Sequence, residues 1–302
     1  MSVLVLGATG FVGKAVCAAL EARGRAFTPS SLSLGHDLRE RDQALALFAQ
    51  TKPQAVINCA SFVGGIQYGF AHPAEIFDNN ARMIANIFAA AHAAGVKRIV
   101  NPVSNCVYPR AKTLFKEDEI WDGALDDSVL VYGMARKFSW VGAWAYARQY
   151  GLDTLNLVLS NMYGPGDHFE ETRSHALGAL IMKFSKAKRE GASSVTVWGT
   201  GAPVREWLYV EDGAEALVRG LDTPATTEFV NVGVASGVSV LELAQKIRAA
   251  VGYEGDIVLD PSKPDGAPFK TVDGARGAAL LGWSPQVSLD EGIARTVAAY
   301  AA

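Results

Sequence analysis

The sequence predicts an α/β fold, and three observations lead to it. Short apolar runs rich in β-branched residues alternate with longer helical patterns through the first half of the chain. A glycine-rich turn directly follows the first of these runs, and after about residue 160 the alternation loosens into turn-rich segments. Strands and helices that alternate in this way form a parallel sheet covered on both faces. We therefore expect a Rossmann-type doubly wound parallel sheet with a smaller C-terminal α/β lobe.

The first half of the chain supplies this sheet and the helices that cover it. The short apolar runs predict strands at 3–6, 55–58, 98–102 and 154–159, with a further strand ending near 27–31. The amphipathic patterns between them predict helices at 11–23, 41–50, 73–94 and 131–150.

The second half predicts a lobe that interleaves with the first. Ser239 is placed to cap a helix at 240–251, and Glu242 completes a capping box. The other expected elements are a helix at 174–190, strands at 195–198, 229–233 and 257–259, a Pro/Gly-rich loop at 261–268 and two short helices near the end. We expect residues 1–160 to form a dinucleotide-binding domain, to which 207–235 return, and residues 161–302 to form mainly a substrate lobe.

Composition and charge exclude several classes of protein. The 302 residues carry 28 basic and 31 acidic side chains, a net charge of −3, whereas nucleic-acid binders usually carry a basic surplus. Three scattered cysteines are too few for a disulfide framework or a zinc site, so no metal is expected. No apolar run approaches the roughly 20 residues of a membrane span, and no basic region precedes the first strand as in a signal peptide. We expect a cytoplasmic enzyme that binds neither nucleic acid nor membrane.

The turn after the first strand has the spacing of a phosphate cradle. Gly7, Gly10 and Gly13 permit a tight turn and let backbone N–H groups approach a pyrophosphate at the start of the following helix. Alone, this spacing also fits a plain strand–helix turn, but its place behind a buried strand favours dinucleotide binding. The residues between these glycines that are expected to contact the cofactor are Thr9, Phe11 and Val12.

The end of the second strand favours NADP(H) over NAD(H). An acidic residue there would bind the ribose 2′-hydroxyl of NAD, and none is present. The residues that could instead serve a 2′-phosphate are Arg25, Thr28, Ser30 and Ser31. Asp37 is expected to contact the adenine, although an exposed turn aspartate is an alternative, and Leu38 and Ala60 are expected to line the same site.

A tyrosine and a cation one helical turn apart suggest the catalytic group. Tyr132 and Arg136 open the long helix at 131–150, and Ser104 follows the fourth strand. A tyrosine placed in this way can pass a proton to a carbonyl oxygen while the neighbouring cation supports its ionisation and holds the nicotinamide ribose. By itself the pair also fits an ordinary helix start with an exposed arginine, and the combination with Ser104 and the glycine turn favours catalysis.

The chain resembles the extended short-chain dehydrogenase/reductase family, and within it the GDP-L-fucose synthase family of NADPH-dependent 3,5-epimerase/4-reductases. The segments that carry this resemblance span nearly the whole chain: the glycine turn, Val63-Gly-Gly-Ile66, Ser104-Asn-Cys-Val-Tyr-Pro109, the Tyr132 helix, Asn161-Met-Tyr-Gly-Pro165, Ser174-His175, Val197-Trp-Gly-Thr-Gly201, Arg205-Glu-Trp-Leu208 and Lys263-Pro-Asp-Gly266.

The resemblance implies a division of labour among the catalytic residues. Ser104 and Tyr132 would bind and protonate the C4 oxygen while hydride adds to C4. Cys106 and His175 would be the acid/base pair that inverts the carbons beside the 4-keto group, since a proton α to a ketone is acidic enough for a thiolate or an imidazole to remove. Without the resemblance, Cys106 reads as a core thiol and His175 as the neighbour of a helix cap.

The resemblance also implies substrate contacts in the second lobe. Asn161 matches the substrate-positioning asparagine of the family, and three cations match positions that hold diphosphate oxygens: Lys183, Arg205 and Lys270. Each could instead be a solvated surface charge. Trp198 could pack on the nucleotide or belong to the core.

Three positions depart from the family pattern. Arg136 stands where the family has a lysine, and Lys137 lies about 100° further around the helix, so the two cannot reach the same ribose. Arginine keeps the charge but cannot give up a proton, so we expect an altered proton relay around Tyr132. Asn105 replaces a serine, and Phe269 replaces a basic residue. Both changes fit a related but different nucleotide sugar.

The sequence thus predicts an NADP(H)-dependent enzyme that epimerises and reduces a GDP-linked 4-keto sugar, a deoxyhexose or a heptose. The alternatives are a nucleotide-sugar epimerase with tightly bound NAD(P) and no net reduction, and a catalytically impaired cofactor-binding homologue. A homodimer through a helix bundle is also expected, because the helices at 73–94 and 131–150 are apolar on more than one face. On the second helix the outward cluster is expected to comprise Phe138, Trp140, Val141, Trp144 and Tyr146.

Overall fold

The computed structural model describes residues 1–110, 113–167, 169, 176–263 and 265–301. Its centre is a six-stranded sheet in the order β10-β5-β4-β3-β1-β2, and every pair of neighbouring strands is parallel. The strands are β1 (Val3–Leu6), β2 (Phe27–Ser30), β3 (Ala55–Asn58), β4 (Arg98–Ser104), β5 (Asp153–Leu159) and β10 (Phe229–Val232). The Rossmann-type doubly wound sheet predicted from the sequence is confirmed.

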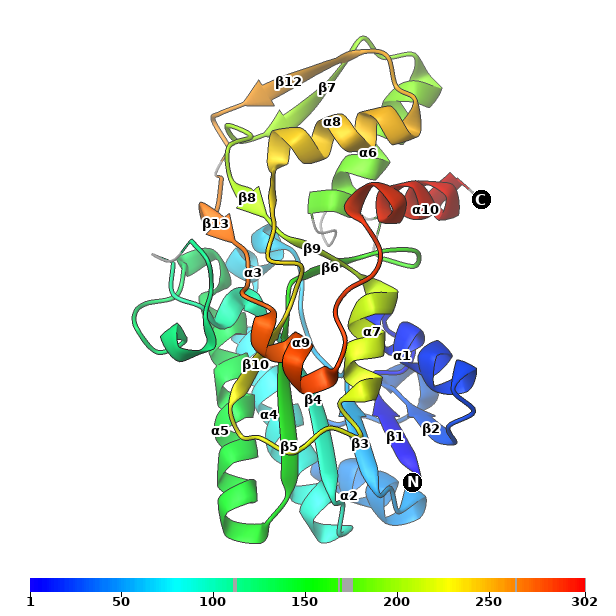
Figure 1. Cartoon of the computed structure of the whole chain (residues 1–302), viewed down its shortest axis with the longest axis vertical. Helices are drawn as coiled ribbons and strands as arrows, with labels where there is room; N and C mark the ends of the chain where they lie inside the picture. The colour runs from blue at the N-terminus through cyan, green and yellow to red at the C-terminus, as the bar shows by residue number, and fades with distance from the viewer. Residues whose placement is uncertain (111–112, 168, 170–175, 264, 302) are drawn as a thin grey trace.

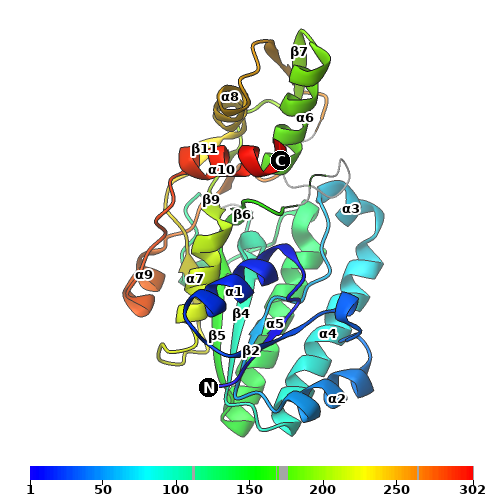
Figure 2. The same cartoon turned by 90° about the vertical axis from the view of Figure 1, so that its right-hand side faces the viewer.

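Helices cover both faces of this sheet (Figures 1 and 2). One face carries α1 (Phe11–Ala22) and α7 (Val210–Arg219), which pack against each other. The other carries α2 (Arg41–Thr51), α4 (Pro73–Ala93) and α5 (Leu130–Tyr150), with α4 in contact with both neighbours. The short α3 (Ile66–Ala71) precedes α4, and α9 (Ala275–Leu281) packs beside β10.

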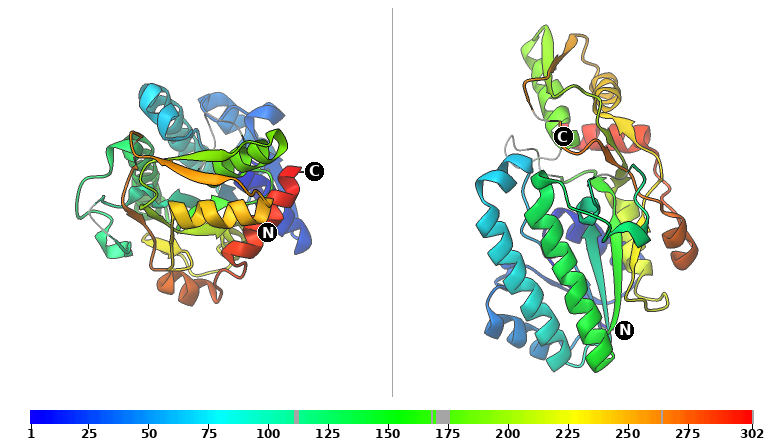
Figure 3. Two further views of the ribbon diagram at one scale, coloured as in Figure 1. Left: turned by 90° about the horizontal axis from the view of Figure 1, so that it is seen from above. Right: turned by 90° about the vertical axis from the view of Figure 1, so that its left-hand side faces the viewer.

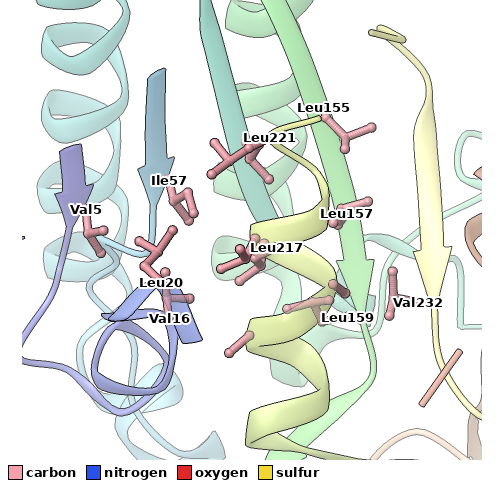
Figure 4. Close-up of a cluster of buried hydrophobic side chains, with 14 of the residues drawn as sticks. Val5, Val16, Leu20, Ile57, Leu155, Leu157, Leu159, Leu217, Leu221 and Val232 are labelled. Carbon is pink, nitrogen blue, oxygen red and sulfur yellow. The ribbon is translucent and has the colours of Figure 1, made fainter. Parts of the chain in front are cut away.

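The strands are buried on both faces because alternate residues enter two different cores. Val3 and Val5 of β1 join the core formed with α1 and α7, part of which is shown in Figure 4. Leu4 and Leu6 point the other way, into the core formed with α2 and α4. Each fully buried aliphatic side chain of this kind contributes about 1.5–3 kcal/mol relative to an exposed one, so these cores fix the frame on which the site stands.

The carboxyl ends of the central strands face a smaller lobe (Figure 1). This lobe contains α6 (Ala176–Glu190), β7 (Ser194–Trp198), α8 (Val240–Val251), β12 (Asp256–Asp260) and α10 (Leu289–Ala301). β7 pairs with β12 in parallel, and the helices enclose a core of their own. The capping box predicted at the start of α8 is present, with Ser239 and Glu242 bonding each other's backbone N–H groups.

Short strands connect the two lobes (Figure 3). β6 (Asn161–Tyr163) pairs with β9 (Trp207–Tyr209), and β8 (Val204–Arg205) lies between β11 (Val238–Ser239) and β13 (Phe269–Lys270). The sequence analysis missed these strands and the helices α3 and α7. Strands of two or three residues and a helix of six carry too little periodicity to be recognised. It also ended β4 two residues early, and residues 174–175 of its helix at 174–190 lie outside the described residues.

The strand order has its switch point between β1 and β3. β1 lies between β2 and β3, so the chain leaves β1 toward one side of the sheet and returns on the other. In open α/β sheets a ligand binds outside the carboxyl ends of the strands at this switch point. Within the part of the chain that the structure describes, no helix is both long enough and apolar enough to cross a membrane.

Candidate active site

The glycine turn lies at this switch point and is packed too closely for other residues. Gly7 has φ +72°, and a Cβ there would come within 2.7 Å of the Cys59 carbonyl at the end of β3. A Cβ at Gly13 would come within 2.0 Å of the Gly7 oxygen. The turn therefore needs glycine at both positions to hold the start of α1 against the ends of β1 and β3.

The start of α1 is suited to an anion. Gly10 is its N-cap, and within the described structure no side chain caps this end and no acidic residue occupies the first turn. The first backbone N–H groups of a helix need acceptors, and the helix dipole favours a negative one. Phe11 and Val12 in this turn are half-buried, and Val12 packs on the core beneath. These residues fit the pyrophosphate of a dinucleotide.

Hydroxyl groups gather where β2 ends beside this turn. Ser33 Oγ lies 2.9 Å from Thr9 Oγ1 and 3.0 Å from Ser31 Oγ. Ser30 is fully buried, and its Oγ has no hydrogen-bond partner among the described residues. Arg25, considered above for a 2′-phosphate, is a wrong choice: it precedes β2, lies at the opposite end of the strand and pairs with Asp222.

Asp37 lies in the next turn and is held by Arg39. The guanidinium donates to both carboxylate oxygens, which lowers the pKa of Asp37 below its usual value, and it also donates to Asn79 on α4. Leu38 is buried in the core beside α2 and Ala60 is half-buried after β3. The expected adenine contact of Asp37 would thus use a carboxylate that already has one cationic partner.

The proposed catalytic tyrosine lies on α5, beside the end of β3. Tyr132 and Arg136 are one helical turn apart, and the guanidinium carbon lies 5.0 Å from the centre of the phenol ring. Arg136 is only 3% exposed, and its Nη2 donates to Ser61 Oγ and to Asn80 Oδ1, both at 2.9 Å. Ser61 Oγ in turn donates to the Tyr132 hydroxyl at 3.2 Å.

The sequence analysis missed Ser61 and Asn80. Ser61 follows the carboxyl end of β3, the edge at which ligands of such sheets bind, and Asn80 is a polar residue on the buried face of α4 between Ile76 and Ile84. Each of these positions could have marked the residue as a candidate for the site. Neither residue could be linked to Arg136 without knowing that α4 and α5 pack together.

Lys137 points away from this group, as expected from its position on the helix. Its ammonium donates to the Ile120 carbonyl at 2.6 Å and lies 4.4 Å from the centre of the Trp121 ring. Burial lowers the pKa of Lys137. The cation of this helix that faces Tyr132 is therefore Arg136.

Ser104 and Cys106 share one short turn at the end of β4. Ser104 Oγ accepts a hydrogen bond from the Cys106 N–H at 3.3 Å, and the 3-10 turn Asn105–Val107 follows. Lys270 Nζ donates to Cys106 Sγ at 3.6 Å. Asn105 is buried, and its Nδ2 lacks a partner among the described residues. His175, the expected partner of Cys106 in epimerisation, lies outside the described residues.

Arg205 lies near this turn but is engaged with the backbone. Its Nη1 donates to the Val204 carbonyl at 2.9 Å, and burial lowers the pKa of Arg205. The carboxylates of Asp126 and Asp265 act in the opposite direction and raise its pKa. Its role toward a diphosphate stays a prediction.

The other proposed substrate residues lie on the second lobe and at its junction with the first. Asn161 Nδ2 donates to the Glu206 carbonyl at 2.8 Å. Lys183 Nζ donates to the Thr196 carbonyl and lies 4.8 Å from the ring centre of Trp198, which is exposed. Lys263 Nζ lies 5.7 Å from the centre of the same ring, so two ammonium groups contact one exposed indole.

Glu206 is a buried carboxylate that the sequence analysis did not single out. It accepts from Ser160 Oγ at 2.6 Å and from the Val272 N–H at 2.8 Å, and also from the Val234 N–H. Burial raises its pKa. These partners come from three separate segments, so Glu206 links the residues that follow β5, β10 and β13.

A glycine turn free to bind phosphate, together with Ser104 and Tyr132 at the same edge of the sheet, is the arrangement of a dinucleotide-dependent enzyme of the short-chain dehydrogenase class. The chain belongs to the NAD dependent epimerase/dehydratase family, the extended branch of that class, and the family profile matches residues 3–233.

Curated relatives match along nearly the full length. The chain is 36% identical to GDP-L-fucose synthase 1 of Arabidopsis thaliana, over 97% of this chain and 91% of the relative. It is 35% identical to the GDP-L-fucose synthase of Escherichia coli K12, over 97% and 94%, and 31% identical to the GDP-L-colitose synthase of Yersinia pseudotuberculosis, over 98% and 96%.

Solved structures share the whole fold. A GDP-L-fucose synthetase of Naegleria fowleri bound to NADP has a TM-score of 0.90 at 28% identity, over 99% of this chain and 92% of that one. A GDP-6-OMe-4-keto-L-xylo-heptose reductase of C. jejuni has a TM-score of 0.93 at 24% identity, over 99% and 97%. At 24% identity, the similarity to this reductase concerns the fold alone.

Proposed function

We propose that this chain is an NADP(H)-dependent enzyme that acts on a GDP-linked 4-keto sugar, a deoxyhexose or a heptose, inverts carbon beside the keto group and reduces C4. The observation that carries this proposal is the turn after β4. That turn carries both Ser104, which would hold a ketone oxygen, and Cys106, which would remove a proton beside that ketone, and the backbone N–H of Cys106 donates to Ser104 Oγ at 3.3 Å. One keto sugar placed at this turn would reach both groups.

The residues divide the chemistry as follows. Cys106 as thiolate takes the proton α to the ketone, and the Lys270 ammonium beside it balances the charge on sulfur. His175 is proposed to supply the second proton carrier that inversion requires. Ser104 and Tyr132 bind the C4 oxygen, and Tyr132 delivers its proton there. Bound NADPH supplies the hydride.

Two features support NADP(H) and a GDP-sugar. The hydroxyls of Thr9, Ser31 and Ser33 gather where β2 ends, and among the described residues no carboxylate bonds to them, which suits a 2′-phosphate. The GDP-L-fucose and GDP-L-colitose synthases among the relatives support the nucleotide. Lys183, Trp198, Arg205 and Lys270 would hold the nucleoside diphosphate.

The test uses the purified chain with NADPH and GDP-4-keto-6-deoxymannose in D2O. We expect the absorbance of reduced nicotinamide to fall and the product to carry deuterium on carbon beside C4. Arg136 in place of lysine specifically favours a second candidate, an epimerase without net reduction. Deuterium uptake without NADPH consumption would establish that candidate, and neither change with any of the GDP-, UDP-, CDP- and dTDP-linked 4-keto sugars would overturn both.

A further inference from the structure

Ser61 lies between the cation and the phenol of the catalytic pair. The Arg136 guanidinium donates to Ser61 Oγ at 2.9 Å, and the Ser61 hydroxyl donates to the Tyr132 oxygen at 3.2 Å. The two bonds run in one direction, from cation to serine to tyrosine. This direction is the one needed to stabilise a phenolate and to return a proton to it.

Arg136 itself cannot be the source of that proton. An arginine side chain keeps its charge throughout the accessible pH range, whereas a lysine can release and regain a proton. Arg136 is also fixed in place: its Nη2 donates to Asn80 Oδ1. Asn80 is fully buried, and its Nδ2 donates to the carbonyls of Phe62 and Ile76.

Ser61 differs from Arg136 in its access to solvent. The residue is exposed, whereas Arg136 is 3% exposed. Of the two residues, Ser61 is therefore the one that solvent reaches. A hydroxyl that accepts a charged hydrogen bond and donates to a phenol can pass a proton without leaving its position.

Resting on the proposed reduction, we propose that Ser61 returns the proton to Tyr132 in each turnover, the task that a lysine at position 136 would share. The O–H bond of Tyr132 breaks as its proton moves to the C4 oxygen. The phenolate then takes the proton of Ser61 while Ser61 takes one from water, so one solvent proton is consumed and no electron moves. Arg136 holds the Ser61 oxygen and keeps all its protons.

The first test compares Ser61→Ala, Ser61→Thr and the control Ser194→Ala, which removes an exposed hydroxyl from β7. We expect Ser61→Ala to lower kcat for NADPH oxidation about tenfold at unchanged KM, Ser61→Thr to retain most of it and Ser194→Ala to change nothing. Imidazole buffer should restore kcat of Ser61→Ala several-fold, because a soluble acid can replace a missing proton carrier. Loss of kcat in both Ser61 variants, without rescue by imidazole, would show that Ser61 only positions Arg136 and overturn the proposal.

The second test replaces Arg136 by a lysine, a cation that can release a proton. In an Arg136→Lys background the ammonium can supply the proton, so Ser61→Ala should cost less than about twofold there. An equal cost in both backgrounds would contradict the relay. Thermal unfolding of each variant checks that the chain is folded.

A substrate-free measurement separates this inference from the proposed function. The 13Cζ resonance of labelled Tyr132, identified by its loss in Tyr132→Phe, reports the charge on the phenol. Removal of the Ser61 donor should shift this resonance at a fixed alkaline pH, because the phenol oxygen loses a hydrogen bond, and Ser61→Thr should not. If wild-type enzyme turns over no keto sugar, the proposed function fails, and a resonance unchanged in Ser61→Ala would overturn the Ser61 inference independently.

Discussion

The Lys270 ammonium donates a hydrogen bond to the Cys106 thiol over 3.6 Å, although the two residues are 164 positions apart in the chain. Lys270 belongs to β13, which pairs with β8 in the small sheet between the lobes. Cys106 belongs to the turn after β4 of the central sheet. The small sheet therefore places a cation beside the thiol. A positive charge there would stabilise the thiolate that takes a proton from the sugar.

This contact predicts the reactivity of Cys106. Alkylation by iodoacetamide requires the thiolate, so Lys270→Met should slow the modification of Cys106 about tenfold at neutral pH. Burial raises the pKa of both other cysteines, Cys17 and Cys59, which should react far more slowly. Mass spectrometry of the peptides measures each rate. Lys183→Met is the matched control, and equal rates for Lys270→Met and wild type would show that Lys270 does not support the thiolate.

The first lobe could be predicted from the sequence because its signals are local. Buried strands, glycine spacing and the position of Arg136 against Lys137 on one helix all follow from short-range periodicity. Arg25 was misjudged because it was grouped with the residues at the end of the second strand, whereas it precedes β2 and therefore lies at the opposite edge of the sheet.

The remaining site residues depend on contacts that no local pattern reveals. Ser61 and Arg136 are 75 positions apart, and Lys270 meets Cys106 only because β13 joins β8. The role of Lys270 toward a diphosphate stays a prediction, whereas its contact with the Cys106 thiol was not expected from the sequence. A lysine in the sequence indicates a side chain that can contact an acceptor, but only the tertiary fold determines which group it contacts.

Cys106→Ser should separate proton exchange from cofactor binding. A serine hydroxyl is a far weaker base than a thiolate, so deuterium uptake beside the ketone should fall at least about 100-fold. NADPH affinity should stay unchanged, because Cys106 lies on the sugar side of the site in our proposal. Fluorescence titration of NADPH and NMR of the recovered sugar measure the two effects. Cys17→Ser is the control, and undiminished exchange in Cys106→Ser would remove the thiol from the mechanism.

Tyr132→Phe should abolish reduction while the fold stays intact. The phenol is the proposed proton donor to C4, and loss of a general acid costs about 100-fold or more in kcat. The variant retains the ring beside Arg136, so its thermal unfolding should match that of wild type. NADPH consumption is the measurement. Turnover unaffected by the substitution would exclude Tyr132 as the proton donor and overturn the proposed chemistry.

Asp37 and Arg39 predict a pH-dependent contribution to stability. The pKa of Asp37 is lowered in the folded protein, so its contribution is present above the unfolded value of about 3.9 and disappears as the pH falls through the lowered pKa. Asp37→Asn should cost about 1 kcal/mol at pH 7, allowing for partial solvent screening. Urea unfolding from pH 7 to about pH 3 should show the gap to wild type closing. Asp256→Asn, in an exposed position of β12, should give no such trend, and a gap independent of pH would contradict the assignment.

The outer face of α5 predicts a homodimer. Two of the five residues expected on that face, however, do not lie on it. Trp140 and Tyr146 turn inward: the Trp140 ring stacks on Phe229, and the Tyr146 ring stacks on Phe88. The other three residues of the expected cluster are between 43% and 46% exposed, and Leu130 and Met134 extend the same stripe along the helix. The stripe consists of Leu130, Met134, Phe138, Val141 and Trp144.

An apolar stripe of this kind on a long helix is best buried against the same helix of a second copy, in an antiparallel or parallel bundle. Light scattering at micromolar concentration should therefore give twice the mass of the 32.1 kDa chain. Phe138→Glu places a charge in the stripe and should yield monomers, whereas Val258→Glu, at an equally exposed apolar position on β12 of the smaller lobe, should leave the dimer intact. A wild-type chain that scatters as a monomer, or a dimer that survives Phe138→Glu but not Val258→Glu, would place the contact elsewhere or exclude it.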